Sequence, residues 1–438
     1  MIDDKMLKSA FDEIIMLRRE FHQKPEKGWM EYCTTAKIIE YLKELDFKVK
    51  YGRDIICENS RNGLPEKEEF EAAFKNALTS GVDRNILKSI RDGFTGVVGK
   101  LDSGCPGKTT AFRFDIDAMP GEEICSSNHK PFEDGFSSMN SGTMHSCGHD
   151  GHAALGLVLA RCIKKMKDDG ILNGKVIFIF QPAEEGVRGA KSVVDSGILD
   201  DTDYFFSGHI GLKSKRTGEI ICGARGFLST IKLDCSFKGV SAHAGSCPEK
   251  GRNALLAAST AAIGVHTLAQ HGAGTSRINV GMLNAGTSRN TIPDRAKLCM
   301  EIRGENDEIT QDILKRVKEI INGAAAMYGV QSIIEIVGQA PSGKSDSKLI
   351  NIIKNACKNI KEIDSIIDEA NFGASEDVTF MMNRVQANGG NACYTIIGSN
   401  LAGEHHTEYF DFDERSLGIW LRLNMEVISI INKVREII

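Results

Sequence analysis

The sequence predicts an α/β protein whose large, mixed but mainly parallel sheet is interrupted in the chain by a smaller α+β unit. Short apolar runs alternate with helical segments in the first half of the chain, which favours a parallel sheet covered by helices. From about residue 225 the pattern changes to strict apolar-polar alternation, which is typical of half-exposed strands. The length of 438 residues also exceeds what one core needs, so two domains are expected.

The first half of the chain supplies the strands of the large sheet. Residues 4–48 have apolar residues at helical spacing, and the polar segment 60–93 is expected to be helical in pieces. Four apolar runs then suit buried strands, at 95–101, 109–117, 175–185 and 203–209. A helix from about residue 152 separates the second run from the third, as a parallel crossover requires.

The middle of the chain predicts a ferredoxin-like unit in the order βαββαβ. Its elements are expected at 229–238, 252–270, 277–286, 296–303, 307–328 and 331–337. Helices and buried strands return afterwards and end in a helix at 414–436. We therefore expect residues 1–224 and 339–438 to form the large domain and residues 225–338 to be inserted in it.

Composition excludes several classes of protein. The formal net charge of −5 offers no basic surface, so no nucleic-acid partner is expected. No stretch approaches 18 uninterrupted apolar residues, which argues against a membrane protein and against secretion. The twelve cysteines are scattered without a CxxC pair, as in a reduced, cytoplasmic protein.

The segment MHSCGHDGH, residues 144–152, gathers metal-binding side chains just before the predicted helix. On a helix, Cys147 and His149 would point about 200° apart, because each residue advances by about 100°. Gly148 and Gly151 permit an irregular turn instead. We expect this turn to direct the thiolate and the imidazole toward one ion.

Further polar side chains follow the ends of three predicted strands, where ligands collect in open α/β sheets. They are Asp115 and Asp117, Glu184 and Glu185, and His209. Of two adjacent glutamates, one can bind metal while the other takes a proton from water. With a single nearby thiolate and no second cysteine pair, this set predicts an open hydrolytic site and not a structural zinc site.

Eight segments, taken in order, resemble the M20 family of metallopeptidases and amidohydrolases, and most of all its branch of N-acyl amino acid amidohydrolases. They are RFDIDAMP, MHSCGHDGH, FQPAEEGVRGA, GHIGL, GVSAHAG, GTSRNTIPD, GASEDVT and GEHHTEYFDFDE. The resemblance implies a metal-dependent exopeptidase-like catalytic domain with an inserted lid or dimerisation domain.

The resemblance also implies roles for ten residues. Two divalent ions, Mn²⁺ in preference to Zn²⁺, would be held by Cys147, His149, Glu185, His209 and His406, with Cys147 bridging. Glu184 would be the general base and Asp117 would orient a ligand. His243 would stabilise the oxyanion, and Asn290 and Arg303 would hold the substrate's carboxylate. The doublet His405-His406 leaves open which of the two binds metal, and the match of YFDFDE downstream favours His406.

The implied reaction is hydrolysis of an acyl or aroyl amide of an amino acid, with p-aminobenzoyl-glutamate as the expected small-molecule substrate. A broader N-acyl amino acid hydrolase or dipeptidase is the alternative. A non-catalytic partner subunit is a further alternative, against which Glu184 and the complete ligand set argue. The resemblance implies a homodimer, or a heterodimer with a related subunit, in which His243 acts in the neighbour's active site.

Overall fold

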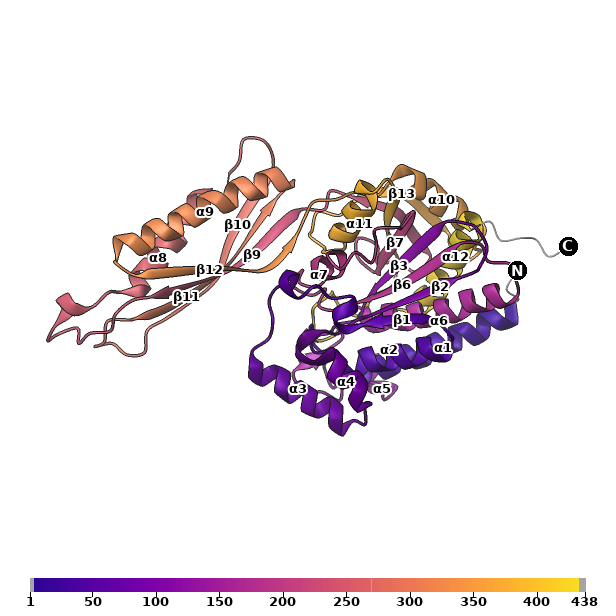
Figure 1. The fold of residues 1–438 in the computed structure, drawn as a ribbon, viewed down its shortest axis with the longest axis horizontal. Helices are drawn as coiled ribbons and strands as arrows, with labels where there is room; N and C mark the ends of the chain where they lie inside the picture. Colours follow the sequence, from indigo (N-terminus) through magenta and orange to yellow (C-terminus); the bar gives the residue numbers. More distant parts are fainter. Residues whose placement is uncertain (1–3, 269, 433–438) are drawn as a thin grey trace.

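The computed structural model describes residues 4–268 and 270–432, and it has the expected α/β architecture. A large eight-stranded sheet has helices on both faces, and a four-stranded sheet with two helices extends away from it (Figure 1). The expected last helix is α12, Arg415–Ile431, and residues 433–436 of that expectation lie outside the described residues. Among the described residues, no helix is long and apolar enough to cross a membrane.

The large sheet has the order β1-β2-β6-β3-β7-β14-β8-β13 and is mixed. Its strands are β1 Lys48–Tyr51, β2 Val97–Asp102, β3 Thr109–Asp115, β6 Lys175–Gln181, β7 Tyr204–Ile210, β8 Glu219–Arg225, β13 Ser365–Asn371 and β14 Asn391–Ile397. Strands β6, β3, β7 and β14 are parallel neighbours. The carboxyl ends of β3, β6 and β7 therefore meet at one edge of the sheet.

The two faces of this sheet pack against different sets of helices. One face packs on α1 Asp4–Gln23, α2 Tyr32–Glu44, α6 His149–Asp168, α10 Ser347–Cys357 and α12. The other face packs on α7 Ala190–Val194 and α11 Val378–Ala387. Strand β6 shows the alternation that this requires, because Phe178 lies in the first core while Ile177 and Ile179 lie in the second.

The helical periodicity of residues 4–48 corresponds to two helices, and the residues between and after them are not helical. Helices α1 and α2 are separated by residues 24–31, and β1 follows α2. Pro25 has no backbone N–H to continue the helical hydrogen bonds, and Trp29 has a φ of 70°. The polar segment 60–93 does form short helices, α3 Lys67–Thr79 and α4 Arg84–Ile90. Between β3 and α6 lie the short elements β4 Met119–Pro120, α5 Lys130–Glu133 and β5 Thr143–Met144.

The small sheet is antiparallel, with the order β10-β11-β9-β12. Its elements follow in the expected order βαββαβ: β9 Ser229–Lys238, α8 Ala254–Val265, β10 Ser276–Ala285, β11 Arg295–Gly304, α9 Asp307–Met327 and β12 Gln331–Ala340. Apolar side chains such as Ile231, Leu233 and Phe237 pack with the two helices in a separate core. The opposite face of the sheet carries the alternate, polar residues of β9.

Two helical glycines offer a matched test of the packing. A methyl group at Gly156 in α6 would lie 2.6 Å from Phe114 and 2.7 Å from Phe180, whereas one at Gly323 in α9 would meet nothing within 4 Å. We expect Gly156→Ala to cost about 1–3 kcal/mol through overpacking. Gly323→Ala should stabilise by up to about 1 kcal/mol through helix propensity. Urea unfolding measures both, and equal effects would contradict the packing described.

Candidate metal centre

Four segments bring the expected ligands together at the carboxyl ends of β3, β6 and β7. Three overlapping groups each have their ligand atoms within 4.8 Å of one another: Cys147, His149 and His209; Cys147, Glu185 and His406; and His149, Glu184 and Glu185. Cys147 belongs to two groups and is buried. The five residues expected to bind metal and the expected base thus lie in one cluster, which we call the acidic-thiol cluster.

The turn before α6 allows Cys147 and His149 to converge. The expected helix start near residue 152 is wrong by three residues, because α6 begins at His149. Gly148 precedes it with a φ of 97°, a conformation that residues with a side chain rarely adopt. Cys147 therefore lies before the helix, with its Sγ 3.3 Å from Nε2 of His209, while His149 lies in the first helical turn.

Asp117 holds two parts of the cluster in place. Its carboxylate oxygens accept hydrogen bonds from the backbone N–H groups of Glu184 and Glu185, each at 3.0 Å. Its carbonyl oxygen accepts a hydrogen bond of 2.9 Å from Nδ1 of His149. Because a carbonyl only accepts, this contact places the proton on Nδ1 and leaves Nε2 of His149 free to bind an ion.

Two buried atoms of the cluster fit a metal ion. Nε2 of His149 and Oε1 of Glu185 have no hydrogen-bond partner. His406 Nε2 approaches this Glu185 oxygen only to 3.5 Å. Buried polar atoms are almost always hydrogen-bonded, so these exceptions need a cause. Thiolate, imidazole and carboxylate donors are ligands of divalent transition metals.

The acids of the cluster have perturbed pKa values. Burial, followed by repulsion from Glu376 and Glu185, raises the pKa of Glu184 well above its ordinary value. Burial and the Glu185 carboxylate likewise raise the pKa of the Cys147 thiol. Burial disfavours ionisation of Glu185 too, but His406 and His149 hold its pKa below the ordinary value. A bound cation would favour the thiolate, since metal binding displaces the thiol proton.

The two adjacent histidines have different surroundings. His405 donates from Nε2 to the carbonyl of Ile210 at 3.0 Å, and burial lowers its pKa to about 4. His406 has a φ of 65° and groups with Cys147 and Glu185. The side chain that faces the acidic-thiol cluster is therefore that of His406.

The residues expected to contact substrate lie in the small domain, His243 and Asn290 in loops between its elements and Arg303 on β11. His243 is exposed, and its Nδ1 accepts the N–H groups of Gly245 and Ser246 at 3.1 Å. Asn290 lies beside it, since its carbonyl accepts the N–H of Ala244 at 3.0 Å. Arg303 is bound by Glu301 through two contacts of 3.1 Å.

The chain does not bring His243 and Asn290 to the acidic-thiol cluster. The N–H of Gln339 on β12 donates to the carbonyl of Val187, just after the two glutamates, at 2.9 Å. Gln339 pairs with Ile231, so this contact lies near the start of β9. His243 follows the other end of β9, a strand of ten residues that spans about 30 Å. The loop after β9 lies at the end of the small sheet remote from the large one (Figure 1).

A buried charge network behind the cluster was not predicted. Arg113 is fully buried and contacts Asp115 at 2.8 Å, Glu376 at 3.2 Å and Asp377 at 3.3 Å. Asp377 also accepts the N–H groups at the start of α7. Two of the quoted motifs, RFDIDAMP and GASEDVT, contain these residues, but their spacing gives no sign that they pair.

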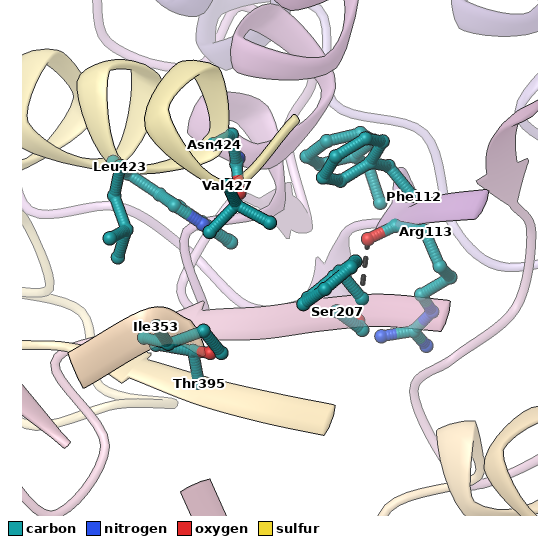
Figure 2. A pocket seen from close by; sticks show the side chains of 11 residues that line it. Phe112, Arg113, Ser207, Ile353, Thr395, Leu423, Asn424 and Val427 are labelled. Atoms are coloured by element: carbon teal, nitrogen blue, oxygen red, sulfur yellow. Dashed lines mark hydrogen bonds between the residues drawn. The ribbon is translucent and has the colours of Figure 1, made fainter. Parts of the chain in front are cut away.

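A small cavity of about 10 Å³ lies between β3, β7, β14 and α12 (Figure 2). Its walls include Phe112, Ile353 and Val427, and Ser207 Oγ donates to Arg113 O there at 3.3 Å. This volume holds about one water molecule. No member of the acidic-thiol cluster lines it, so it is a packing void and not a substrate site.

The fold and the donor set define a metal-dependent amidohydrolase or peptidase. The chain belongs to Peptidase family M20/M25/M40, whose model matches residues 111–428. The family expected from the motifs is thereby confirmed.

Two relatives match nearly the whole chain. It is 43% identical over 417 residues to the indole-3-acetyl-aspartic acid hydrolase of Enterobacter agglomerans, covering 95% of each chain. It is 42% identical over 403 residues to one subunit of the p-aminobenzoyl-glutamate hydrolase of Escherichia coli strain K12, covering 92% of each. Among solved structures, the aminobenzoyl-glutamate utilization protein from Klebsiella pneumoniae matches with a TM-score of 0.84, 37% identity and 97% of each chain covered.

The role of Asp117 can be tested by metal titration. Asp117→Asn keeps the side-chain size but presents an NH₂ group to one of the two backbone N–H donors. Metal affinity should fall by about 10- to 100-fold, as for other residues that orient ligands. Asp168→Asn, at an exposed position of α6, is the control and should bind as the wild type does. Unchanged affinity in Asp117→Asn would contradict this role.

Proposed function

We propose that this protein is a dinuclear hydrolase of N-acyl amino acids that cleaves p-aminobenzoyl-glutamate to p-aminobenzoate and glutamate. The observation that carries the proposal is the pair of ligand groups that share Cys147, one with His149 and His209 and one with Glu185 and His406. These two adjoining groups, which share Cys147, would hold two divalent ions. One relative is named as a hydrolase of an aspartic acid conjugate and another as a hydrolase of a glutamate conjugate. These names support an acidic amino acid as the second part of the substrate.

The donor set is compatible with Mn²⁺ and with Zn²⁺, and we propose Mn²⁺ on the resemblance to the M20 family. Divalent ions, when bound, lower the pKa of water and polarise the amide carbonyl. The chain's part is to hold them close to Glu184, which groups with His149 and Glu185.

Glu184 acts as the general base and then as the general acid. It accepts a proton from the attacking water as the water oxygen bonds to the amide carbon. It then passes the proton to the leaving nitrogen as the carbon–nitrogen bond breaks. Burial and the neighbouring carboxylates raise the pKa of Glu184, which favours uptake of the proton in the first step.

The proposal includes a dimer in which the small sheet of one protomer completes the site of the other. His243 would stabilise the oxyanion there, and Asn290 and Arg303 would hold the substrate's carboxylate. The remote position of His243 in its own chain supports action across the interface. The partner is a second copy or a related chain, since one relative is named as one subunit of a hydrolase.

A broader N-acyl amino acid hydrolase is the second candidate function. It is favoured by the relative that acts on an indole-acetyl amide instead of an aminobenzoyl amide. Turnover of p-aminobenzoyl-glutamate, indole-3-acetyl-aspartate, hippurate and dipeptides by metal-loaded protein distinguishes the two. A preference of kcat/KM for p-aminobenzoyl-glutamate supports the first, and equal values for all the acyl groups support the second.

The division of roles between the two glutamates gives a direct test. Glu184→Gln retains the size of the side chain but cannot accept a proton, so kcat should fall by roughly 10²- to 10⁴-fold. Its metal content, measured by elemental analysis, should remain that of the wild type. Glu185→Gln should lose metal. The opposite pattern would require the two roles to be exchanged.

Mixing two inactive variants tests whether His243 acts across the dimer interface. His243→Ala should lower kcat by about 10²- to 10³-fold, the usual cost of removing an oxyanion donor. When His243→Ala and Glu184→Gln exchange protomers, one site of each mixed dimer regains both groups. Activity should then rise well above that of either parent. No recovery despite verified exchange would contradict action in trans.

A further inference from the structure

Lys232 on β9 lies against the turn that carries Glu184 and Glu185. Its neighbours Ile231 and Leu233 are buried under the helices of the small sheet, so Lys232 projects from the opposite face. It pairs in register with Gly338 on β12. A methyl group built on Gly338 would lie 2.3 Å from Gly186 O, 3.4 Å from Val187 Cγ2 and 3.4 Å from Lys232 Cδ. The stem of Lys232 and the turn that follows Glu185 therefore both lie close to Gly338.

The charge of Lys232 is not neutralised by an ion pair. In the parts of the chain that the structure describes, no carboxylate oxygen lies within 4.0 Å of its Nζ. Glu301 lies opposite Lys232 in the strand register, but its two oxygens bind Arg303. Burial lowers the pKa of Lys232, while Glu301, Glu184 and Glu185 are near enough to oppose this effect. A half-buried ammonium group thus lies near the two glutamates of the cluster and has no ion-pair partner among the described residues.

A second cation beside the cluster has a structural task. Arg188 donates from Nε to the carbonyl of Glu185 at 2.7 Å and from Nη1 to the carbonyl of Gly63 at 3.0 Å. These contacts fix the turn after Glu185 to the loop at residues 61–63. Arg303 is paired with Glu301 and is the proposed holder of one substrate carboxylate, so among these three cations Lys232 remains available for a second one.

We propose that Lys232 binds the side-chain carboxylate of the amino acid released from the substrate and so selects N-acyl amino acids with acidic side chains. This inference rests on the proposed function. A substrate with two carboxylates enters a site already rich in carboxylates, and it needs a cation for each negative charge that the bound ions do not offset. Lysine and a carboxylate form a charge-assisted hydrogen bond, which is stronger than a neutral one.

The experiment compares two substrates that differ only in this carboxylate, p-aminobenzoyl-glutamate and p-aminobenzoyl-glutamine. Lys232→Met keeps the apolar stem and removes the charge. It should lower kcat/KM for the glutamate compound by roughly 10- to 100-fold, the loss of a hydrogen bond to a charged group. The glutamine compound should be almost unaffected. Lys232→Arg should restore most of the preference, and Lys238→Met, at the exposed far end of the same strand, should behave as the wild type.

The ratio of the two kcat/KM values is taken on one protein preparation, so it does not depend on the fraction of folded enzyme. A Lys232→Met variant with the wild-type ratio would overturn the inference while leaving the proposed function intact. Equal losses on both substrates would also overturn it, because they would place Lys232 at a group that both compounds share. A wild-type protein that hydrolyses neither compound would contradict the proposed function itself, and the inference with it.

Discussion

The arrangement of the site depends on one carboxylate that is not itself a member of the acidic-thiol cluster. Asp117 accepts the backbone N–H groups of Glu184 and Glu185 through its side chain and the ring N–H of His149 through its carbonyl. Ala183 and Val187, on either side of the glutamates, both have positive φ values, so this turn needs support from outside. Asp117 therefore joins the loop after β3, the turn after β6 and the start of α6 at one point.

Buried ion pairs on either side of these three segments hold them in a fixed arrangement. Arg113 joins β3 to the loop before α11 through Glu376 and Asp377. On the other side, Arg18 in α1 binds Asp150 in α6 at 2.9 Å and also contacts Glu414 at 3.1 Å. Charges removed from water are tolerated only when paired, so the loss of one partner would leave the other buried and unpaired. The residues of the acidic-thiol cluster are thus supported by buried ion pairs on both sides.

The periodicity of apolar residues predicted those helices and strands that alternate between a buried and an exposed face. It could not predict contacts between residues that are far apart in the sequence. Strand β9 matches its expected range of 229–238, because its alternate residues face helices and solvent in turn. The start of α6 was expected too late, since the φ of Gly148 cannot be read from spacing. The motifs led to Cys147 and His149, yet the partners of Arg113 and the task of Lys232 were missed. Those depend on side chains that only tertiary packing brings together.

We propose that the segments of the acidic-thiol cluster together hold two divalent ions, with His149 and His209 as ligands of one, Glu185 and His406 as ligands of the other, and Cys147 shared. Anomalous diffraction at the manganese edge, from crystals grown with Mn²⁺, tests it most directly. Two peaks should lie in the acidic-thiol cluster, with Cys147 Sγ between them, His149 and His209 on one side and Glu185 and His406 on the other. A single peak in this cluster, or ions bound instead by Glu184, Glu376 and Asp377, would contradict the account.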